Sequence, residues 1–288
     1  MHTQKVIFIT GSSRGFGLEI TKAALDEGDK VIATVRDKPE QLKEKLKNHP
    51  DLLVLSMDVT NEDRVIEAVS QGIRHFGRID TLINNAGYGI ITAIEEASDV
   101  EVKKQYATNV FGLLNVVRAV LPYMRAERSG HIINISSLFA YGTYPGWSLY
   151  GSTKSAVEGI SRGLAVELAP LGIYVTSVEP GIFRTGFLSA ESYALSENVI
   201  DDYLEIVGPS KELGTTLHGR QPGDPEKLAR VILDLVHLPI PPLQLPIGKD
   251  AVKMITDGID ATRAIIDEWY SVSTSTDFDE APQPEKAK

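Results

Sequence analysis

The chain has 288 residues and a mass of 31.4 kDa, with 42% hydrophobic and 24% charged residues. This ordinary globular composition excludes a wholly disordered or fibrous protein. The formal net charge is −10, so nucleic acid and anionic membranes are poor candidates as partners. Cysteine is absent, which excludes disulfides, thiolate catalysis and cysteine-ligated metals.

No apolar run reaches the roughly 18 residues of a membrane span. The apolar run near the N-terminus, residues 6–9, is too short for the core of a signal peptide. We therefore expect a cytoplasmic protein that binds neither nucleic acid nor membrane.

Strand-like and helix-like segments alternate from the first residues onward. Apolar runs predict strands at residues 5–10, 31–35, 52–57, 80–84, 131–136 and 174–178. Helical patterns predict helices at residues 18–27, 41–47, 62–76, 100–128 and 149–168. This alternation predicts a doubly wound α/β fold of the Rossmann type, a parallel sheet of about seven strands flanked by helices.

The pattern breaks after residue 186. Residues 186–221 are predicted to be mostly irregular, and such a segment in a compact domain typically serves as a lid over a substrate. Asp224 and Pro225 predict the N-cap and first residue of a helix over 226–236.

Two further elements are expected before the C-terminus. Residues 243–247 predict a last strand, at an edge because of Pro246, and residues 251–270 a terminal helix. The polar sequence after them predicts a disordered tail over 271–288. We therefore expect a single domain over residues 1–270.

The turn after the first strand reads TGSSRGFG at residues 10–17. Glycines let the backbone turn tightly and approach a pyrophosphate, and the following helix offers unpaired N–H groups to the anion. In this strand–turn–helix setting the turn predicts a dinucleotide site rather than a plain structural turn. Contacts are expected from Gly11, Ser13, Arg14, Gly15, Phe16 and Gly17.

The end of the second strand bears on the choice of dinucleotide. A carboxylate there typically binds the ribose of NAD, whereas an arginine suits the 2′-phosphate of NADP. Here Arg36 follows the strand and Arg14 lies in the turn, so two guanidinium groups favour NADP (NADPH) over NAD. The adjacent Asp37 complicates this prediction, because Arg36 and Asp37 could also be ordinary solvated charges.

Polar residues also follow the third and fourth strands. The carboxyl ends of parallel strands line the ligand crevice, so Asp58 could accept a hydrogen bond from an adenine amine. Asn84 and Asn85 are typical turn-forming residues, for which we expect a structural role more than direct contact. The cofactor contacts predicted in these two segments are Asp58, Val59, Asn85, Ala86 and Gly87.

Tyr150 and Lys154 stand four residues apart in the segment YGSTK at 150–154, which places them on one face of a helix. A phenol has an ordinary pKa of about 10, and a neighbouring ammonium lowers that pKa toward the range where proton transfer is efficient. Such a pair is common by itself and gains meaning only from its setting.

That setting resembles the classical short-chain dehydrogenase/reductase family over about residues 3–250. The matching elements, in the family's order and spacing, are TGSSRGFG at 10–17, Asp58, NNAG at 84–87, Asn109, Ser137, YGSTK at 150–154, Pro180, Gly181 and Thr185. The segment ATVRD at 33–37 and the long C-terminus resemble, more weakly, the hydroxysteroid and retinol dehydrogenase branch.

The resemblance implies a role for each matching residue. Tyr150 would be the general acid or base, and Lys154 would lower its pKa and bind the nicotinamide ribose. Ser137 would hold the substrate oxygen. Asn109 would hold a water of a proton relay, although a helix-bending role is the alternative. Thr185, after Pro180 and Gly181, would bind the nicotinamide carboxamide. No metal is expected, since the His residues are scattered.

Aromatic and apolar residues predict the substrate. They lie between Ser137 and Tyr150 and in the segment 186–221, and they predict a pocket for an apolar ketone, aldehyde or alcohol. They could equally pack the lid onto the body. The residues are Phe139, Tyr141, Tyr144, Trp147, Phe187, Leu188, Tyr193 and Tyr203.

The expected function is therefore an NADPH-dependent carbonyl reductase or alcohol dehydrogenase. The alternatives are a 3-oxoacyl-type reductase, a dehydratase or epimerase of the same fold, and a non-catalytic NADP-binding regulatory protein. The intact Tyr150–Lys154 pair argues against the last of these. The resemblance also implies a homodimer or homotetramer packed through the helices at 100–128 and 150–168, although the long C-terminus could block one interface.

Overall fold

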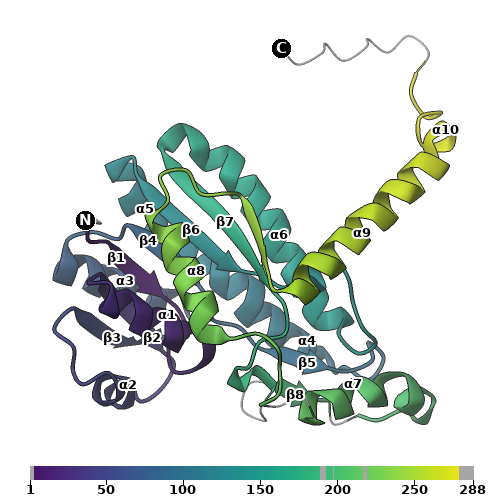
Figure 1. Cartoon of the computed structure of the whole chain (residues 1–288), viewed down its shortest axis with the longest axis horizontal. Coiled ribbons are helices and arrows are strands. Elements are labelled where there is room, and N and C mark those ends of the chain that lie inside the picture. The colour runs from purple at the N-terminus through teal and green to yellow at the C-terminus, as the bar shows by residue number, and fades with distance from the viewer. Residues whose placement is uncertain (1–2, 189–192, 197, 217–218, 279–288) are drawn as a thin grey trace.

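The computed structural model of the chain describes residues 3–188, 193–196, 198–216 and 219–278. Within these ranges, seven parallel strands form one sheet in the order β3-β2-β1-β4-β6-β7-β9 (Figure 1). The doubly wound α/β fold is thereby confirmed. The strands are β1 (Val6–Ile9), β2 (Lys30–Val35), β3 (Leu52–Ser56), β4 (Thr81–Asn84), β6 (Gly130–Ile135), β7 (Ile173–Pro180) and β9 (Gln244–Ile247).

Helices cover both faces of this sheet. Ile7 and Ile9 of the central strand β1 pack in one core with α1 (Gly15–Asp26) and α8 (Pro225–His237). Val6 and Phe8 pack in a second core with α3 (Glu62–Phe76), α5 (Leu113–Glu127) and α6 (Ser148–Leu168). All four residues of β1 are fully buried, as a strand between two helical layers requires. The short helix α2 (Pro39–Lys45) lies between β2 and β3 in the chain.

The predicted helix over 100–128 is interrupted. It begins as α4 (Asp99–Tyr106), passes through the π-helical stretch Ala107–Gly112, and continues as α5. A Ser98–Glu101 capping box fixes its start. Asn109 lies in the π-helical stretch, and such stretches commonly carry functional side chains.

The prediction of a mostly irregular segment over 186–221 is wrong for the described residues. A 3₁₀ turn (Gly186–Leu188) is followed by β8 (Tyr193–Leu195), which pairs in parallel with β5 (Gly89–Ile91), and then by α7 (Leu204–Thr216). β8 is too short to give a periodic signal, and Pro209 lies inside α7, where it argues against a helix. In Figure 1 these elements lie together beside the lower end of the sheet.

A buried carboxylate fastens this segment to the body. Glu96 is 1% exposed and accepts hydrogen bonds from the backbone N–H groups of Ala93 and Ile200. Lys211 of α7 forms an ion pair with it at 3.2 Å. Burial alone would raise the pKa of Glu96, but these donors together hold it below its ordinary value. The segment with α7 is therefore anchored by an ionised group inside the protein.

The C-terminal elements follow the predictions closely. The Asp224 carboxylate accepts from the N–H groups of Glu226 and Lys227, and Pro225 is the first residue of α8. β9 contains Pro246 and lies at the edge of the sheet. The terminal helix is α9 (Lys249–Glu268), and α10 (Tyr270–Ser273) carries helical structure past the predicted boundary at residue 270. Residues 279–288 of the predicted tail lie outside the described residues.

Candidate active site

The turn between β1 and α1 depends on three glycines. Gly11 and Gly15 have positive φ angles of 72° and 56°, which disfavour any residue with a Cβ. Gly17 has no room for a side chain, since a Cβ would lie 2.4 Å from the Gly11 carbonyl oxygen. α1 also begins without a capping side chain and without an acidic residue in its first turn. The free N–H groups of that turn fit a pyrophosphate, which would act as the cap.

The segment after β4 holds this turn in place. The Asn85 side chain donates to the carbonyl oxygens of Thr10 and Gly11, at 2.9 and 3.0 Å. The N–H groups of Asn85 and Ala86 donate to the Thr10 hydroxyl. Asn84 donates to the Asn134 side chain on the neighbouring strand β6. The predicted structural role of the asparagine pair is confirmed, while cofactor contacts of Asn85, Ala86 and Gly87 stay predictions.

The residues predicted to choose the cofactor are on the surface. Arg36 pairs with Asp37 at 3.3 Å, and their side chains are 75% and 76% exposed. An ion pair this exposed contributes little to stability, so the Arg36 guanidinium is available to an incoming phosphate. Ser13 and Arg14 are exposed in the glycine-rich turn. Asp58 accepts from the N–H and the hydroxyl of Thr60, which leaves its contact with an adenine a prediction.

Tyr150 and Lys154 lie on α6, and Ser137 follows β6. All three side chains are buried. The Ser137 hydroxyl forms a hydrogen bond with the Tyr150 hydroxyl. The Lys154 ammonium donates to the Ile135 carbonyl oxygen at 2.7 Å and lies 5.6 Å from the centre of the Tyr150 ring. The structure thus gathers the three residues that the sequence placed together.

Burial opposes the predicted lowering of the Tyr150 pKa by Lys154, which stays a prediction. Burial raises the pKa of Tyr150 far above its ordinary value of 10, and the hydrogen bond from Ser137 opposes that rise only in part. Burial also lowers the pKa of Lys154 to about 8. The Lys154 ammonium donates to the Ile135 carbonyl and not to the Tyr150 hydroxyl. The phenol is therefore shielded from water, and the Lys154 ammonium does not contact its hydroxyl to offset that burial.

Asn109 connects this cluster to the loop after β4. Its side chain donates to the Tyr88 carbonyl and the Thr153 hydroxyl, and its oxygen accepts from the Tyr88 N–H. A Cβ at Gly87 would lie 3.2 Å from that oxygen and 3.8 Å from the Lys154 nitrogen. Asn109 therefore fixes the backbone beside Lys154, and its role toward a relay water stays a prediction.

The loop after β7 is held by a residue that the sequence did not reveal. Asp250, in the first turn of α9, accepts from the Ile182 N–H at 2.6 Å. It lies so close to Gly181 that a Cβ there would be 2.0 Å from its carboxylate. The same loop brings Thr185 to the glycine-rich turn, 3.6 Å from where a Gly15 Cβ would be. Contacts of Pro180, Gly181 and Thr185 with a nicotinamide stay predictions.

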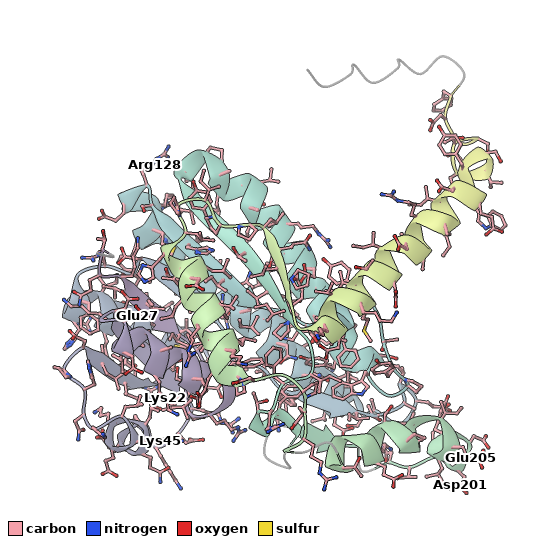
Figure 2. All side chains as sticks on the ribbon, in the orientation of Figure 1. Lys22, Glu27, Lys45, Arg128, Asp201 and Glu205 are labelled. Atoms are coloured by element: carbon pink, nitrogen blue, oxygen red, sulfur yellow. The ribbon has the colours of Figure 1, made fainter. Side chains whose placement is uncertain are left out.

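Aromatic side chains surround Tyr150. The rings of Phe139, Trp147 and Phe187 lie 6.1, 5.6 and 5.5 Å from its ring, centre to centre. Tyr144 packs edge-on against Phe139. Figure 2 shows side chains filling the space between α6 and the elements β5, β8 and α7. These rings therefore cluster around Tyr150, and their role as the wall of a substrate pocket stays a prediction.

Other members of the predicted wall lie elsewhere. The placement of Tyr141 in this wall is wrong, because its hydroxyl contacts Glu158 of α6 and Gln244 of β9. The 3₁₀ turn Leu138–Ala140 lies between Ser137 and Tyr141 and turns the chain. Tyr203 packs at the edge of the aromatic cluster and donates to Glu95. The side chains of Leu188 and Tyr193 lie outside the described residues.

A buried carboxyl pair lies next to this group. Glu158, one turn after Lys154 on α6, accepts from the Ser177 hydroxyl and the Gln244 amide. Glu179 of β7 faces it, and both side chains are 1% exposed. Burial, together with the charge of Glu158, raises the pKa of Glu179 to about 8. At neutral pH Glu179 therefore keeps its proton.

The pair predicts a pH-dependent stability. The folded protein keeps the Glu179 proton up to about pH 8, whereas the unfolded chain releases it near 4.5. The resulting stabilisation is present in full below 4.5 and is lost as the pH rises through about 8. We expect Glu179→Gln to remove this loss, so that the stability of the variant exceeds that of the parent by at most about 5 kcal/mol at about pH 9, because the two pKa values lie about 3.5 apart.

Thermal melts over a pH series measure this effect. The control is Glu167→Gln, an exposed glutamate on the same helix as Glu158. Parallel pH dependences of the parent and Glu179→Gln would show that Glu179 does not hold the proton.

Two searches of the described residues bear on other kinds of site. They contain no group of three or more His, Asp or Glu side chains that could hold a metal ion. No helix among them combines the length and apolar character that a membrane crossing needs. The candidate site therefore consists of the glycine-rich turn between β1 and α1, the cluster of Tyr150 with Ser137 and Lys154, and the aromatic rings around Tyr150.

Known proteins resemble this chain over nearly its whole length. Oxidoreductase BOA17 of Botryotinia fuckeliana is 40% identical over 274 residues, which are 94% of this chain and 99% of that protein. The 3-ketodihydrosphingosine reductase of Bacteroides thetaiotaomicron is 39% identical over 244 residues, 85% of this chain and 88% of that protein.

Solved structures agree with this likeness. A short-chain dehydrogenase from Streptomyces avermitilis has a TM-score of 0.88 at 40% identity, covering 96% of this chain and 100% of that one. ElxO with NADP bound has a TM-score of 0.73 at 27% identity, covering 87% and 100%. The family model described as short chain dehydrogenase matches residues 5–194. The chain therefore belongs to the short-chain dehydrogenase family and is an oxidoreductase of that family.

Proposed function

We propose that this protein is an NADPH-dependent carbonyl reductase or alcohol dehydrogenase that interconverts an apolar ketone or aldehyde and the corresponding alcohol. One observation carries the proposal. The Tyr150 hydroxyl is buried with Ser137 and Lys154 beside it, and aromatic rings surround it. A phenol in such a place can exchange a proton with a substrate oxygen while water is excluded.

The chain's own residues would hold the cofactor. The first turn of α1 would bind the pyrophosphate, and Arg14 and Arg36 the 2′-phosphate. The loop carrying Thr185 would meet the nicotinamide. When bound, the nicotinamide supplies or accepts the hydride. The NADP-bound structure of ElxO supports this choice of cofactor by similarity.

Tyr150 would act as the general acid in the reductive direction. Its raised pKa keeps the hydroxyl protonated at neutral pH, so the proton is available to a carbonyl oxygen. Ser137 would hold that oxygen through its hydroxyl. Lys154, whose pKa burial lowers to about 8, can gain or lose a proton near neutral pH and would restore the Tyr150 proton.

The aromatic wall supports an apolar substrate. Phe139, Trp147 and Phe187 offer a surface that favours hydrocarbon over charged groups. The name of the similar 3-ketodihydrosphingosine reductase also denotes a ketone as its substrate. We further propose a homodimer or homotetramer, as the family resemblance implies.

The test is a set of initial rates of NADPH and NADH oxidation with a panel of ketones, aldehydes and quinones. We expect turnover of apolar carbonyl compounds with a preference for NADPH. Tight NADPH binding without turnover of any carbonyl compound would favour a non-catalytic regulatory protein. Equal use of both cofactors would refute the NADP preference and leave the family assignment intact.

Arg36→Leu tests the cofactor preference directly. We expect the ratio of kcat/KM for NADPH to that for NADH to fall about ten- to a hundredfold, the equivalent of the roughly 1.5–3 kcal/mol of a hydrogen bond to a charged group. Arg74→Leu, which removes an exposed arginine from the last turn of α3, is the matched control. An unchanged ratio in Arg36→Leu would assign the phosphate contact to other residues.

A further inference from the structure

The C-terminal helix extends away from the body of the molecule, and most of its length is exposed. We call residues 249–273, which comprise α9 and α10, the arm. Only its first turns are seated: Ala251 and Ile255 are buried, and a Cβ at Gly258 would lie 2.5 Å from the Tyr141 carbonyl oxygen. From Ile259 onward every described residue is exposed. Figure 1 shows α9 projecting away from the sheet and its helices.

The arm is not uniformly polar. Its apolar residues, with Gly258 and Thr262 among them, recur at seven-residue intervals in three adjacent rows, which together form one stripe along the helix. Side chains on the projecting part are more than half exposed, among them Ile265, Ile266 and Trp269. An apolar stripe this wide on an otherwise polar helix is typical of a packing surface. The rows are Ile255, Thr262 and Trp269; Gly258, Ile265 and Val272; and Ile259 and Ile266.

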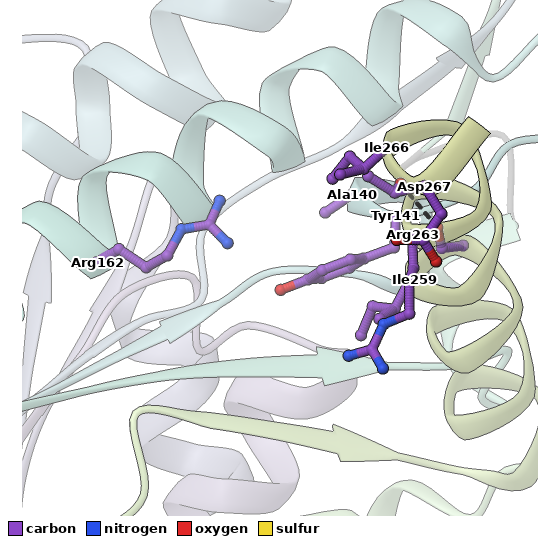
Figure 3. A pocket seen from close by; sticks show the side chains of 9 residues that line it. Ala140, Tyr141, Arg162, Ile259, Arg263, Ile266 and Asp267 are labelled. Atoms are coloured by element: carbon purple, nitrogen blue, oxygen red, sulfur yellow. Dashed lines mark hydrogen bonds between the residues drawn. The ribbon is translucent and has the colours of Figure 1, made fainter. Parts of the chain in front are cut away.

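A groove runs along this stripe, between the arm and the body (Figure 3). Its volume is about 880 Å³. The body contributes Tyr141 and the cation of Arg162 from α6. The arm contributes Ile259 and Ile266, together with the cation of Arg263 and the carboxylate of Asp267. An occupant that suits this groove has an apolar face for the isoleucines and a carboxylate for Arg162.

The arm itself has these properties. Beside the apolar stripe it carries the carboxylates of Asp260, Asp267 and Glu268. We propose that two copies of this chain associate through their arms, antiparallel about a two-fold axis, each arm lying in the groove of the other copy. Such a contact is isologous, so the acidic edge of each arm meets the Arg162 of its partner.

The extent of the stripe fits this partner. Val252, Ile259, Ile265, Ile266, Trp269, Tyr270 and Val272 are each about half exposed or more. Their combined exposed area is on the order of the roughly 800 Å² that each partner contributes to a stable protein interface. An anionic lipid surface is the poorer occupant, because carboxylates outnumber lysine and arginine over residues 249–273.

The first test is the mass of the assembly by sedimentation velocity of the full-length protein. We expect the double substitution Ile266→Glu and Trp269→Glu to halve that mass at micromolar concentration, because it places charges in the stripe. Both side chains are exposed in a single copy, so the substitutions should not lower the stability of the monomer's own fold. Ala264→Glu, on the other side of the same helix, is the control and should keep the parent mass.

The second test uses the absence of cysteine from the chain. A single introduced thiol can form a disulfide only with the same thiol of another copy. Ile265→Cys lies in the stripe near the middle of the arm, and we expect it to form covalent dimers under mild oxidation. Ala264→Cys, its neighbour on the polar side, should remain monomeric on a non-reducing gel.

Three results would overturn the proposal. One is a parent protein that is monomeric throughout the micromolar range. Another is an assembly whose mass the charged arm leaves unchanged, which would assign association to other helices. The last is flotation of the parent with phosphatidylcholine–phosphatidylserine vesicles that the arm substitutions abolish, which would make a lipid surface the occupant.

Discussion

Replacing Tyr150 by Phe is expected to lower kcat by about two to four orders of magnitude, the usual contribution of a positioned general acid or base. The substitution removes only the hydroxyl group. The ring would keep its contacts with Trp147 and Phe187, at 5.6 and 5.5 Å between ring centres. The fold and the apolar pocket should therefore persist while the proton donor is lost.

Three measurements separate chemistry from structure in this variant. Initial rates give the loss of kcat, fluorescence titration gives NADPH affinity, and a thermal melt gives stability. The last two should match the parent. Tyr174→Phe, which removes a hydroxyl from a half-exposed tyrosine on β7, is the control and should keep full activity. If Tyr150→Phe retained its turnover, the proton would have to come from another group.

Replacing Gly17 by Ala is expected to damage the cofactor turn. The new methyl group would lie 2.4 Å from the Gly11 carbonyl oxygen and 2.6 Å from the Asn85 amide nitrogen. Asn85 is itself tied to the carbonyls of Thr10 and Gly11, so the turn cannot move without breaking those hydrogen bonds. Overpacking of this kind costs about 1–3 kcal/mol.

Two readouts follow from this distortion. The melting temperature should fall by roughly 2–4 °C for each kcal/mol lost. The dissociation constant for NADPH should rise tenfold or more, because the N–H groups of α1 no longer converge on one point. Gly163→Ala in α6, where no atom lies within 4 Å of the new methyl, should not lower the melting temperature. Parent-like NADPH affinity in Gly17→Ala would mean that the pyrophosphate does not bind at this turn.

Local signals allowed much of the fold to be predicted from the sequence. Helix α3 has the predicted bounds, 62–76, since Asn61 caps its start and Gly77 ends it in the left-handed conformation. The glycine-rich turn and the Tyr150–Lys154 spacing are equally local. Each of these features is decided by residues within one or two helical turns, so a single sequence reveals it.

Features that depend on distant residues escaped prediction. Asp250 and Ile182 are 68 positions apart, and nothing near either residue indicates their contact. β8 has three residues and pairs with β5, whose Gly89 lies 104 positions before its partner Tyr193. Tyr141 was misplaced because closeness to Ser137 in sequence does not give the direction of a side chain after a 3₁₀ turn. The Tyr150 pKa depends on burial, which spacing does not report.

The contact between Asp250 and the loop after β7 also bears on the order of events during synthesis. Strands β1 to β4 can pair once residue 84 has left the ribosome, because β3, β2, β1 and β4 pair with one another in that order. The loop with Gly181 and Thr185 gains its hydrogen bond to Asp250 only when α9 begins to emerge. A nascent chain that stops short of residue 250 would therefore contain most of the sheet and still lack a fixed wall beside the glycine-rich turn. Cofactor binding thus becomes possible late in translation, and a ligand that stabilises the native state would act only on nearly complete chains.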